Sequence, residues 1–163
     1  MSATTGTHIP QGIKPVLLYS GAANAVTCDV ISTKYVKKVW FMVFHAGSND
    51  TDLTLQLQEA TDVAAGTNQA ITVACPIWRD NDAGSSSDTL VLQTADDNIV
   101  IDPATQNPVL AIIEWDPAKH DHADGYDCIY LADSGGHASN TVQIFALCEM
   151  KYQDSAPPSV IVD

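Results

Sequence analysis

The stretch 51-TDLTLQLQEAT-61 decides the class of fold. Apolar and polar residues alternate strictly through its middle, in the order Leu53, Thr54, Leu55, Gln56, Leu57 and Gln58. Successive side chains of a β-strand point to opposite faces of the sheet. The alternation therefore predicts a strand with one buried face and one solvated face.

The same alternation recurs along the chain, while helical periodicity is almost absent. It is found in 25-AVTCDVIS-32, 70-AITVAC-75 and 88-DTLVLQT-94. Other runs are apolar on both sides, namely 39-VWFMVFHA-46, 109-VLAIIEW-115 and 141-TVQIFALCEM-150. A strand with two apolar sides indicates a sandwich with an additional cover, or an oligomer interface.

Clusters of turn-forming residues separate these runs. They are 46-AGSND-50, 62-DVAAGTNQ-69, 80-DNDAGSSSD-88, 102-DPATQNP-108 and 133-DSGGHASN-140. Glycine and asparagine supply positive φ angles there, and aspartate and serine supply local caps. About eight to ten short strands with such punctuation predict an all-β fold, an antiparallel β-sandwich or barrel-like domain.

The 163 residues fit one domain with a sizeable core, and neither a repeat nor an interdomain linker is visible. We expect the sandwich to span 13–152, with extended arms at 1–12 and 153–163. The C-terminal arm carries a stiff Pro-Pro pair before three aliphatic residues, which suggests docking on a neighbour; a frayed terminus is the alternative. The candidate contact residues of this arm are Pro157, Pro158, Val160, Ile161 and Val162.

The chain is strongly acidic, with 7 Lys+Arg against 20 Asp+Glu and a formal net charge of -13. This imbalance argues against nucleic acid and against anionic membranes as partners. The start, 1-MSATTGTHIPQGIKP-15, lacks the features of a signal peptide, and no apolar run is long enough for a transmembrane helix. We expect a soluble protein that is made in the cytoplasm.

Four cysteines, Cys28, Cys75, Cys128 and Cys148, are spaced too widely for a zinc knuckle. Three of them, all except Cys128, share strand parity with apolar neighbours, as small buried hydrophobes do. Without a secretion signal, free thiols are the prediction.

The segment 116-DPAKHDHADGYDCIYL-131 collects residue types that ligate metals. His120 and His122 lie on one side if the segment is extended, but a third ligand, Asp116, Asp124 or another residue, is not fixed by the sequence. The spacing of the aspartates also departs from a calcium-binding loop. A solvated connection between two strands, with no required metal, is the preferred interpretation.

Catalytic motifs are absent. The chain has no GxSxG motif and no glycine-rich loop that opens a helix. Ser134 and His137 flank a Gly-Gly pair that is ordinary turn chemistry, and the glutamates have no evident carboxylate partner for glycoside cleavage. We therefore expect neither an enzyme nor a cofactor, and we assign no catalytic residue.

The tryptophans offer one candidate for sugar stacking. Trp40 and Trp115 lie inside apolar strands, which predicts core positions. Trp78, in 76-PIWRDND-82, is the one expected to be exposed enough for a ligand. A structural role is the preferred interpretation for all three.

Several segments together resemble a known family. They are the Tyr-Ser pair at 19–20, 39-VWFMVFHAG-47, 57-LQEATD-62, 125-GYDCIYL-131 and 151-KYQDSAPPSV-160. In this order they resemble a family of small acidic β-proteins encoded among the head genes of tailed bacteriophages. The resemblance runs over nearly the whole chain and implies a structural virion protein, a capsid decoration (cement) protein bound outside the major capsid protein. It brings no catalytic residues with it, and the chain departs from the pattern at 119-KHDH-122.

Two other classes of function stay open. One is another virion component, such as a head fibre base or a tail protein. The other is a carbohydrate- or metal-binding module, with Trp78 and the 116–127 connection as its site. The expected partners are the major capsid protein and copies of the chain itself, as a trimer or a dimer, and the expected location is the capsid surface.

Overall fold

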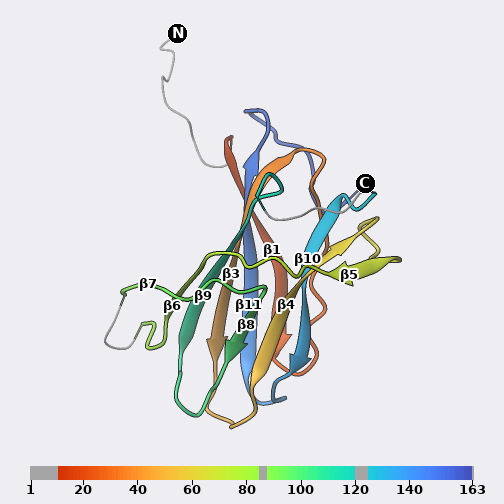
Figure 1. Cartoon of the computed structure of the whole chain (residues 1–163). Coiled ribbons are helices and arrows are strands. Elements are labelled where there is room, and N and C mark those ends of the chain that lie inside the picture. Colours follow the sequence, from red (N-terminus) through yellow and green to blue (C-terminus); the bar gives the residue numbers. More distant parts are fainter. Residues whose placement is uncertain (1–10, 85–87, 120–124, 163) are drawn as a thin grey trace.

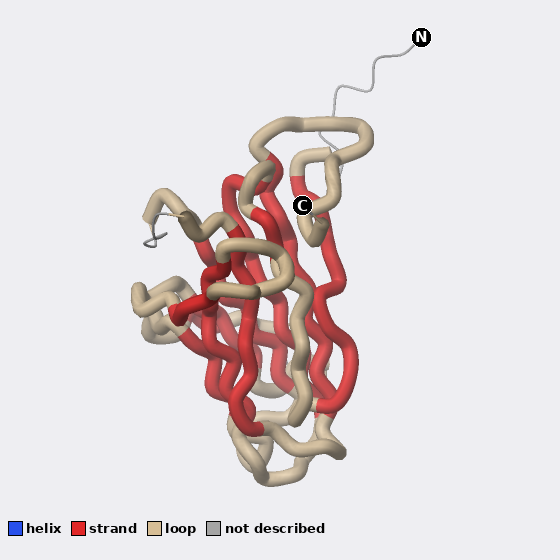
Figure 2. The backbone as a smooth tube through the Cα atoms, turned by 90° about the vertical axis from the view of Figure 1, so that its right-hand side faces the viewer, coloured by secondary structure: helices blue, strands red, loops and turns tan. Residues whose placement is uncertain are grey.

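The computed structural model describes residues 11–84, 88–119 and 125–162. Within these ranges every regular element is a β-strand, which confirms the all-β prediction. Two antiparallel sheets pack against each other as a sandwich (Figure 1), and Figure 2 shows the long strands running along the domain with loops at both ends. The strands are β1 (Ile13–Ala22), β2 (Ile31–Ser32), β3 (Val36–Ala46), β4 (Leu53–Ala60), β5 (Asn68–Ala70), β6 (Ile77–Asp80), β7 (Val91–Leu92), β8 (Asn98–Ile101), β9 (Val109–Trp115), β10 (Cys128–Gly135) and β11 (Thr141–Met150).

The larger sheet has six strands in the order β1-β11-β3-β9-β6-β7. The smaller sheet has the order β2-β10-β4-β5, and β8 also pairs with β4. The three runs that are apolar on both sides have become β3, β9 and β11, and these strands lie side by side in the larger sheet. Their second apolar sides therefore add up to one continuous outer face.

The core fills the space between the two sheets. Leu53, Leu55 and Leu57 of β4 are completely buried, as the alternation predicted. They belong to one hydrophobic cluster with residues of the facing sheet, including Phe41 of β3 and Ile113 of β9. Burying a side chain of this size stabilises the fold by about 1.5–3 kcal/mol. The sandwich is therefore held mainly by this single layer of apolar contacts.

Two of the predicted strands are largely segments that pass from one sheet to the other. In 70–75 only Ala70 belongs to a strand, and in 25–32 only Ile31 and Ser32 do. Both segments still bury side chains at alternate positions, or nearly so, because they close the sandwich at its edges. Alternation reports burial on one side of an extended chain, and it does so whether or not a hydrogen-bonded ladder forms.

Two further predictions of strand limits are corrected. In 88–94 only Val91 and Leu92 form a strand. The predicted turn at 133–140 begins later, because β10 continues to Gly135 and pairs there with Leu53 of β4. The partner strand supplies backbone hydrogen bonds, which outweigh the turn preference of an Asp-Ser-Gly sequence.

His45 is a polar residue at the end of β3 that is completely buried. Its neighbours across the sheet are Val109 and Val142, and neither ring nitrogen has a hydrogen-bond partner. Burial lowers the pKa of His45, since the charged imidazolium is disfavoured away from water. The folded chain therefore holds this side chain in its neutral form.

This arrangement predicts a specific pH dependence of stability. The folded pKa of His45 lies below its unfolded value of about 6.5, so the unfolded chain takes up a proton first as the pH falls. The contribution of neutral His45 is present above about pH 6.5 and is lost as the pH falls through the folded pKa. We expect His45→Leu to raise the free energy of unfolding by about 1 kcal/mol at about pH 7, because it removes an unpaired buried polar group. Between about pH 7 and pH 5, the free energy of unfolding of this variant should fall less than that of the wild type.

Urea unfolding followed by tryptophan fluorescence measures both quantities. The two proteins differ only at residue 45, so the difference between the two curves isolates His45. An identical pH dependence for the two proteins would contradict the prediction.

Candidate functional site

The C-terminal segment folds back onto its own domain. Val160 is buried, with 1% of its surface exposed, and belongs to the main core cluster. The backbone N–H of Ser32 in β2 donates to the Val160 carbonyl at 2.6 Å, and Ile161 packs against the core. In this structure the Val160 side chain fills an apolar site of its own sandwich, whereas a contact of the segment with a neighbouring subunit stays a prediction.

A lysine side chain holds the residues just before Val160 by hydrogen bonds. The Lys14 ammonium donates to the carbonyl oxygens of Pro157, at 3.4 Å, and of Pro158. Pro158 is exposed, Pro157 is half-buried, and Val162 is 64% exposed. The predicted contact residues thus divide into an internal plug and an exposed remainder.

The exposed remainder lies beside two tyrosines at one end of the domain. Tyr35 is 37% exposed and Tyr152 is 76% exposed. A hollow of about 350 Å³ in this region is lined by Ser32, Lys34, Tyr35, Asp127, Pro158, Ser159 and Val162. We call this region the C-terminal end surface. It mixes aromatic, apolar and charged groups, a composition that suits a protein contact.

A larger apolar surface lies on the outer side of the six-stranded sheet. One register row crosses all six strands and is apolar at every position. Its members, in sheet order, are Leu17, Phe145, Met42, Ile112, Trp78 and Leu92. All six are exposed or half-buried. We call this row, with the residues beside it on the same side, the sheet face.

A neighbouring row adds Pro15, Leu147 and Trp40 to the sheet face. Between the two rows lies a hollow of about 290 Å³ with almost entirely apolar walls, lined by Ile13, Trp40, Met42, Ile112 and Leu147. Trp115 is completely buried, as predicted, but the prediction of a core position for Trp40 is wrong. Trp40 has odd-numbered apolar neighbours that point inward, so its own side chain points out.

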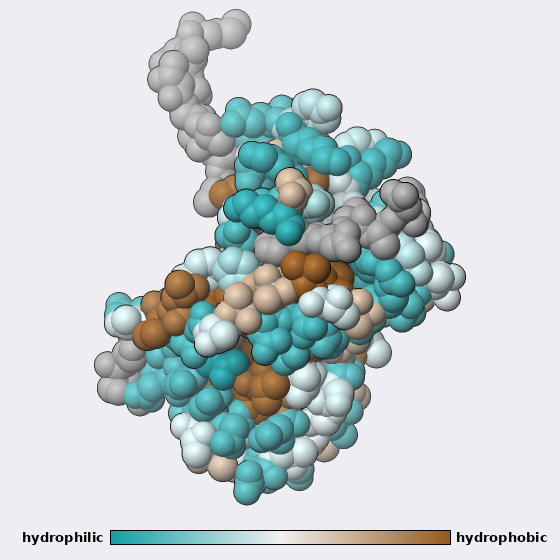
Figure 3. Space-filling model, in the orientation of Figure 1, coloured by the Kyte–Doolittle hydropathy of each residue, from teal (hydrophilic) through white to brown (hydrophobic). Residues whose placement is uncertain are grey.

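The apolar surface continues at the edge of the sheet. Leu92 of the apolar row is 62% exposed and Leu90 is 39% exposed, while Val91, 55% exposed, points to the opposite side of β7. Figure 3 shows a side of the molecule that is mainly hydrophilic, with hydrophobic atoms gathered at its left over β7. An exposed apolar patch of this kind marks a site of interaction.

The charges on the sheet face are paired with one another. The Lys38 ammonium lies 3.1 Å from the Glu114 carboxylate and 5.4 Å from the centre of the Trp40 ring. The Trp40 indole N–H donates to Glu114 at 2.8 Å. Burial tends to raise the pKa of Glu114, but the hydrogen bonds from Lys38 and Trp40 hold it below its ordinary value. At the same end, Lys37 pairs with Glu149 at 2.9 Å.

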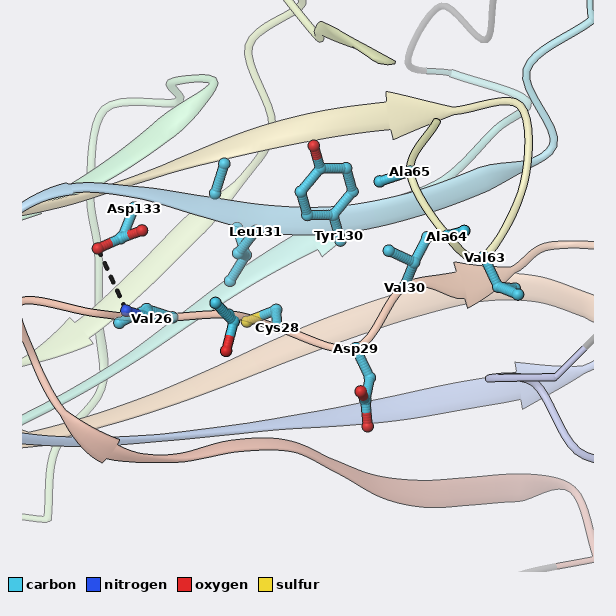
Figure 4. A pocket seen from close by; sticks show the side chains of 12 residues that line it. Val26, Cys28, Asp29, Val30, Val63, Ala64, Ala65, Tyr130, Leu131 and Asp133 are labelled. Carbon is cyan, nitrogen blue, oxygen red and sulfur yellow. Dashed lines mark hydrogen bonds between the residues drawn. The ribbon is translucent and has the colours of Figure 1, made fainter. Parts of the chain in front are cut away.

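A pocket of about 390 Å³ lies on the other sheet (Figure 4). Tyr130 of β10, the loop 63–65 and the segment 26–30 line it. Figure 4 shows the Tyr130 hydroxyl and the Asp29 carboxylate pointing away from each other, while Asp133 accepts a hydrogen bond from the Val26 backbone N–H at 3.3 Å. A small-molecule site needs convergent polar groups, and these do not converge.

The histidine-rich connection is described only at its two ends. The possible ligands His120, His122 and Asp124 lie outside the described residues. Asp116 is engaged by lysines, with its carboxylate 3.9 Å from Lys38 and 3.8 Å from Lys119. Among residues 11–84, 88–119 and 125–162, no group of three or more metal-ligating side chains comes together.

None of the four cysteines forms a disulfide, as predicted, and three of them are fully buried while Cys28 is half-buried. Burial raises the pKa of Cys28, Cys75 and Cys148 to about 12 in each case. The thiolate is the reactive form of cysteine, so these thiols are unreactive near neutral pH.

Comparisons with known proteins place no constraint on function. No protein-family model, no curated protein and no solved structure matches the chain. No helix in the described part of the chain is long and apolar enough to cross a membrane. The sheet face and the C-terminal end surface are therefore the features from which a function must be argued.

Val160 and Val162 form a matched pair for testing the C-terminal plug. We expect Val160→Ala to lower the free energy of unfolding by about 1–3 kcal/mol, because it leaves a cavity in the core. Val162→Ala alters an exposed side chain and is expected to change it by less than about 0.5 kcal/mol. Urea denaturation measures both, and equal effects would show that the segment does not contribute to the core.

The cysteines provide a second test. We expect iodoacetamide at about pH 8 to leave the native protein unmodified and to modify four thiols after denaturation without reductant. Intact-mass spectrometry counts the added groups. Rapid modification of the native protein, or fewer than four modified thiols after denaturation, would contradict the burial or the free state of the cysteines.

Proposed function

We propose that the chain is a structural virion protein, a decoration protein that binds the major capsid protein on the outside of a phage head. The sequence-wide resemblance to small acidic head proteins first indicates this role. The observation that carries it furthest is the sheet face, an apolar surface that crosses six strands. A protein with such a surface functions by contact with another protein.

The composition of the sheet face supports this interpretation. Protein interfaces are enriched in aromatic residues and methionine at their centre and poor in unpaired charge. The sheet face combines Trp40, Trp78 and Phe145 with Met42, and its carboxylates are neutralised by lysines. Binding here requires little desolvation of unpaired charge, which is the main penalty of burying a polar surface.

The surroundings of Trp78 favour a protein partner over a sugar. Trp78 lies between Ile112 and Leu92 in the apolar row. A sugar-binding tryptophan requires polar groups beside it that bond to hydroxyls, and these two neighbours offer none. The C-terminal end surface supplies, apart from the sheet face, a place for contact with the capsid through Pro158 and Val162.

The charge of the chain suits an exposed position on a particle. With a formal net charge of -13, the solvated parts of the surface repel other particles and keep them dispersed. A decoration protein of this kind is made in the host cytoplasm and is incorporated there. A head fibre base or a tail protein is the alternative virion role, and it shares the same need for an apolar contact surface.

Immunogold electron microscopy tests the proposal. An antibody raised against the purified chain is applied to purified particles of the phage that encodes it, and the same antibody absorbed with the chain is the control. We expect gold on the heads. Labelling confined to tails or fibres would replace the decoration role by the other virion role, and unlabelled particles would overturn both.

A further inference from the structure

We propose that the sheet face binds a second copy of this chain, in a face-to-face packing of two six-stranded sheets related by a two-fold axis. The inference rests on the proposed function only in treating the sheet face as a protein-binding surface. It names the partner of that surface and leaves the C-terminal end surface for the capsid.

The sheet face is complementary to itself in shape. Phe145 and Leu17 project from the apolar row, with 37% and 51% of their surface exposed. The hollow of about 290 Å³ lies on the same face, beside Met42 and Leu147. In a two-fold interface, a residue i of one copy contacts a residue j of the other, and the reverse contact also forms. A projection of each copy can therefore enter the hollow of the other, which gives two identical contacts. Aromatic side chains seated in apolar hollows are typical centres of binding energy.

The charges of the sheet face do not oppose the approach of a second copy. Two chains that each carry a formal net charge of -13 repel each other wherever their carboxylates meet. Glu114 and Glu149 on this face are paired with lysines, and Asp80 at its corner is buried. Two copies can therefore approach through this face without bringing unpaired carboxylates together. A basic partner would gain little here, since its charges would find no free acid.

The apolar rows supply the centre of a dimer interface. Strands lie about 4.8 Å apart and side chains on one side repeat about every 7 Å, so the row across six strands and the row of three beside it cover about 300 Å² of flat sheet. A standard interface takes ~800 Å² from each partner, and its apolar centre is surrounded by a polar rim, here the strand ends around the two rows. Two such sheets pack at a distance of about 10 Å with their strands about 30° apart.

Sedimentation of the purified full chain tests the inference. We expect the wild type to sediment as two chains at about 50 μM. Phe145→Asp places a charge in the middle of the sheet face and should raise the dissociation constant of the dimer by about 100-fold or more, the size of a strong hot-spot substitution. Leu17→Lys changes a more exposed member of the same row at the sheet edge, and it should act in the same direction if Phe145→Asp fails to fold.

Val100→Asp is the matched control. Val100 is an exposed aliphatic residue on β8, 44% exposed, and it lies on the outer side of the other sheet. We expect this variant to remain a dimer. Its melting temperature and circular dichroism spectrum should match those of Phe145→Asp and Leu17→Lys, so that only the position of the new charge differs.

A monomeric wild type, or a dimer that both Phe145→Asp and Leu17→Lys leave intact, overturns the inference. A wild type of three or more chains also overturns it, since a two-fold face closes with two. These outcomes are independent of the antibody labelling: a monomer that decorates heads removes only the dimer, and a dimer that labels no particle removes only the virion role.

Discussion

Alternate side chains of the long strands are buried between two sheets, and this one apolar layer holds the molecule together. Leu55 of β4 and Phe41 of β3 are both fully buried in it. Because successive side chains of a strand point to opposite sides, burying one side fixes which residues face outward. The outer faces of both sheets are therefore consequences of how the core is filled.

The same layer explains the C-terminal segment. A two-sheet sandwich leaves a gap at its edge wherever the chain crosses from one sheet to the other, and the region around β2 is such a crossing. Val160 enters the core there and its carbonyl accepts a hydrogen bond from Ser32. The segment that begins at Lys151 thus joins the core at Val160, while Tyr152 and Val162 stay exposed to solvent.

The outer sides of the two sheets have different physical characters. On the five-stranded sheet, Gln56 and Gln58 of β4 are half-buried polar residues that face outward. On the six-stranded sheet, the outward row from Phe145 through Met42 to Ile112 is apolar across β11, β3 and β9, and Glu114 and Glu149 form ion pairs with lysines. The rest of the surface of this acidic chain carries unpaired carboxylates, which oppose the approach of another acidic surface. The apolar outer side of the six-stranded sheet opposes it least.

The sequence by itself determined the fold class and which side of each long strand is buried, because alternation at period two is a local property of an extended chain. It also indicated that 141–150 has a second apolar side, but it did not show which other strands extend that side into one surface. The pairing register of the strands decided which ones do. Only the pairing of strands far apart in the sequence sets Leu17 beside Phe145 and Trp78 beside Ile112, since the bonds between strands join backbone groups that every residue except proline carries. The position of Val160 was likewise a tertiary decision, made by the apolar gap that it fills.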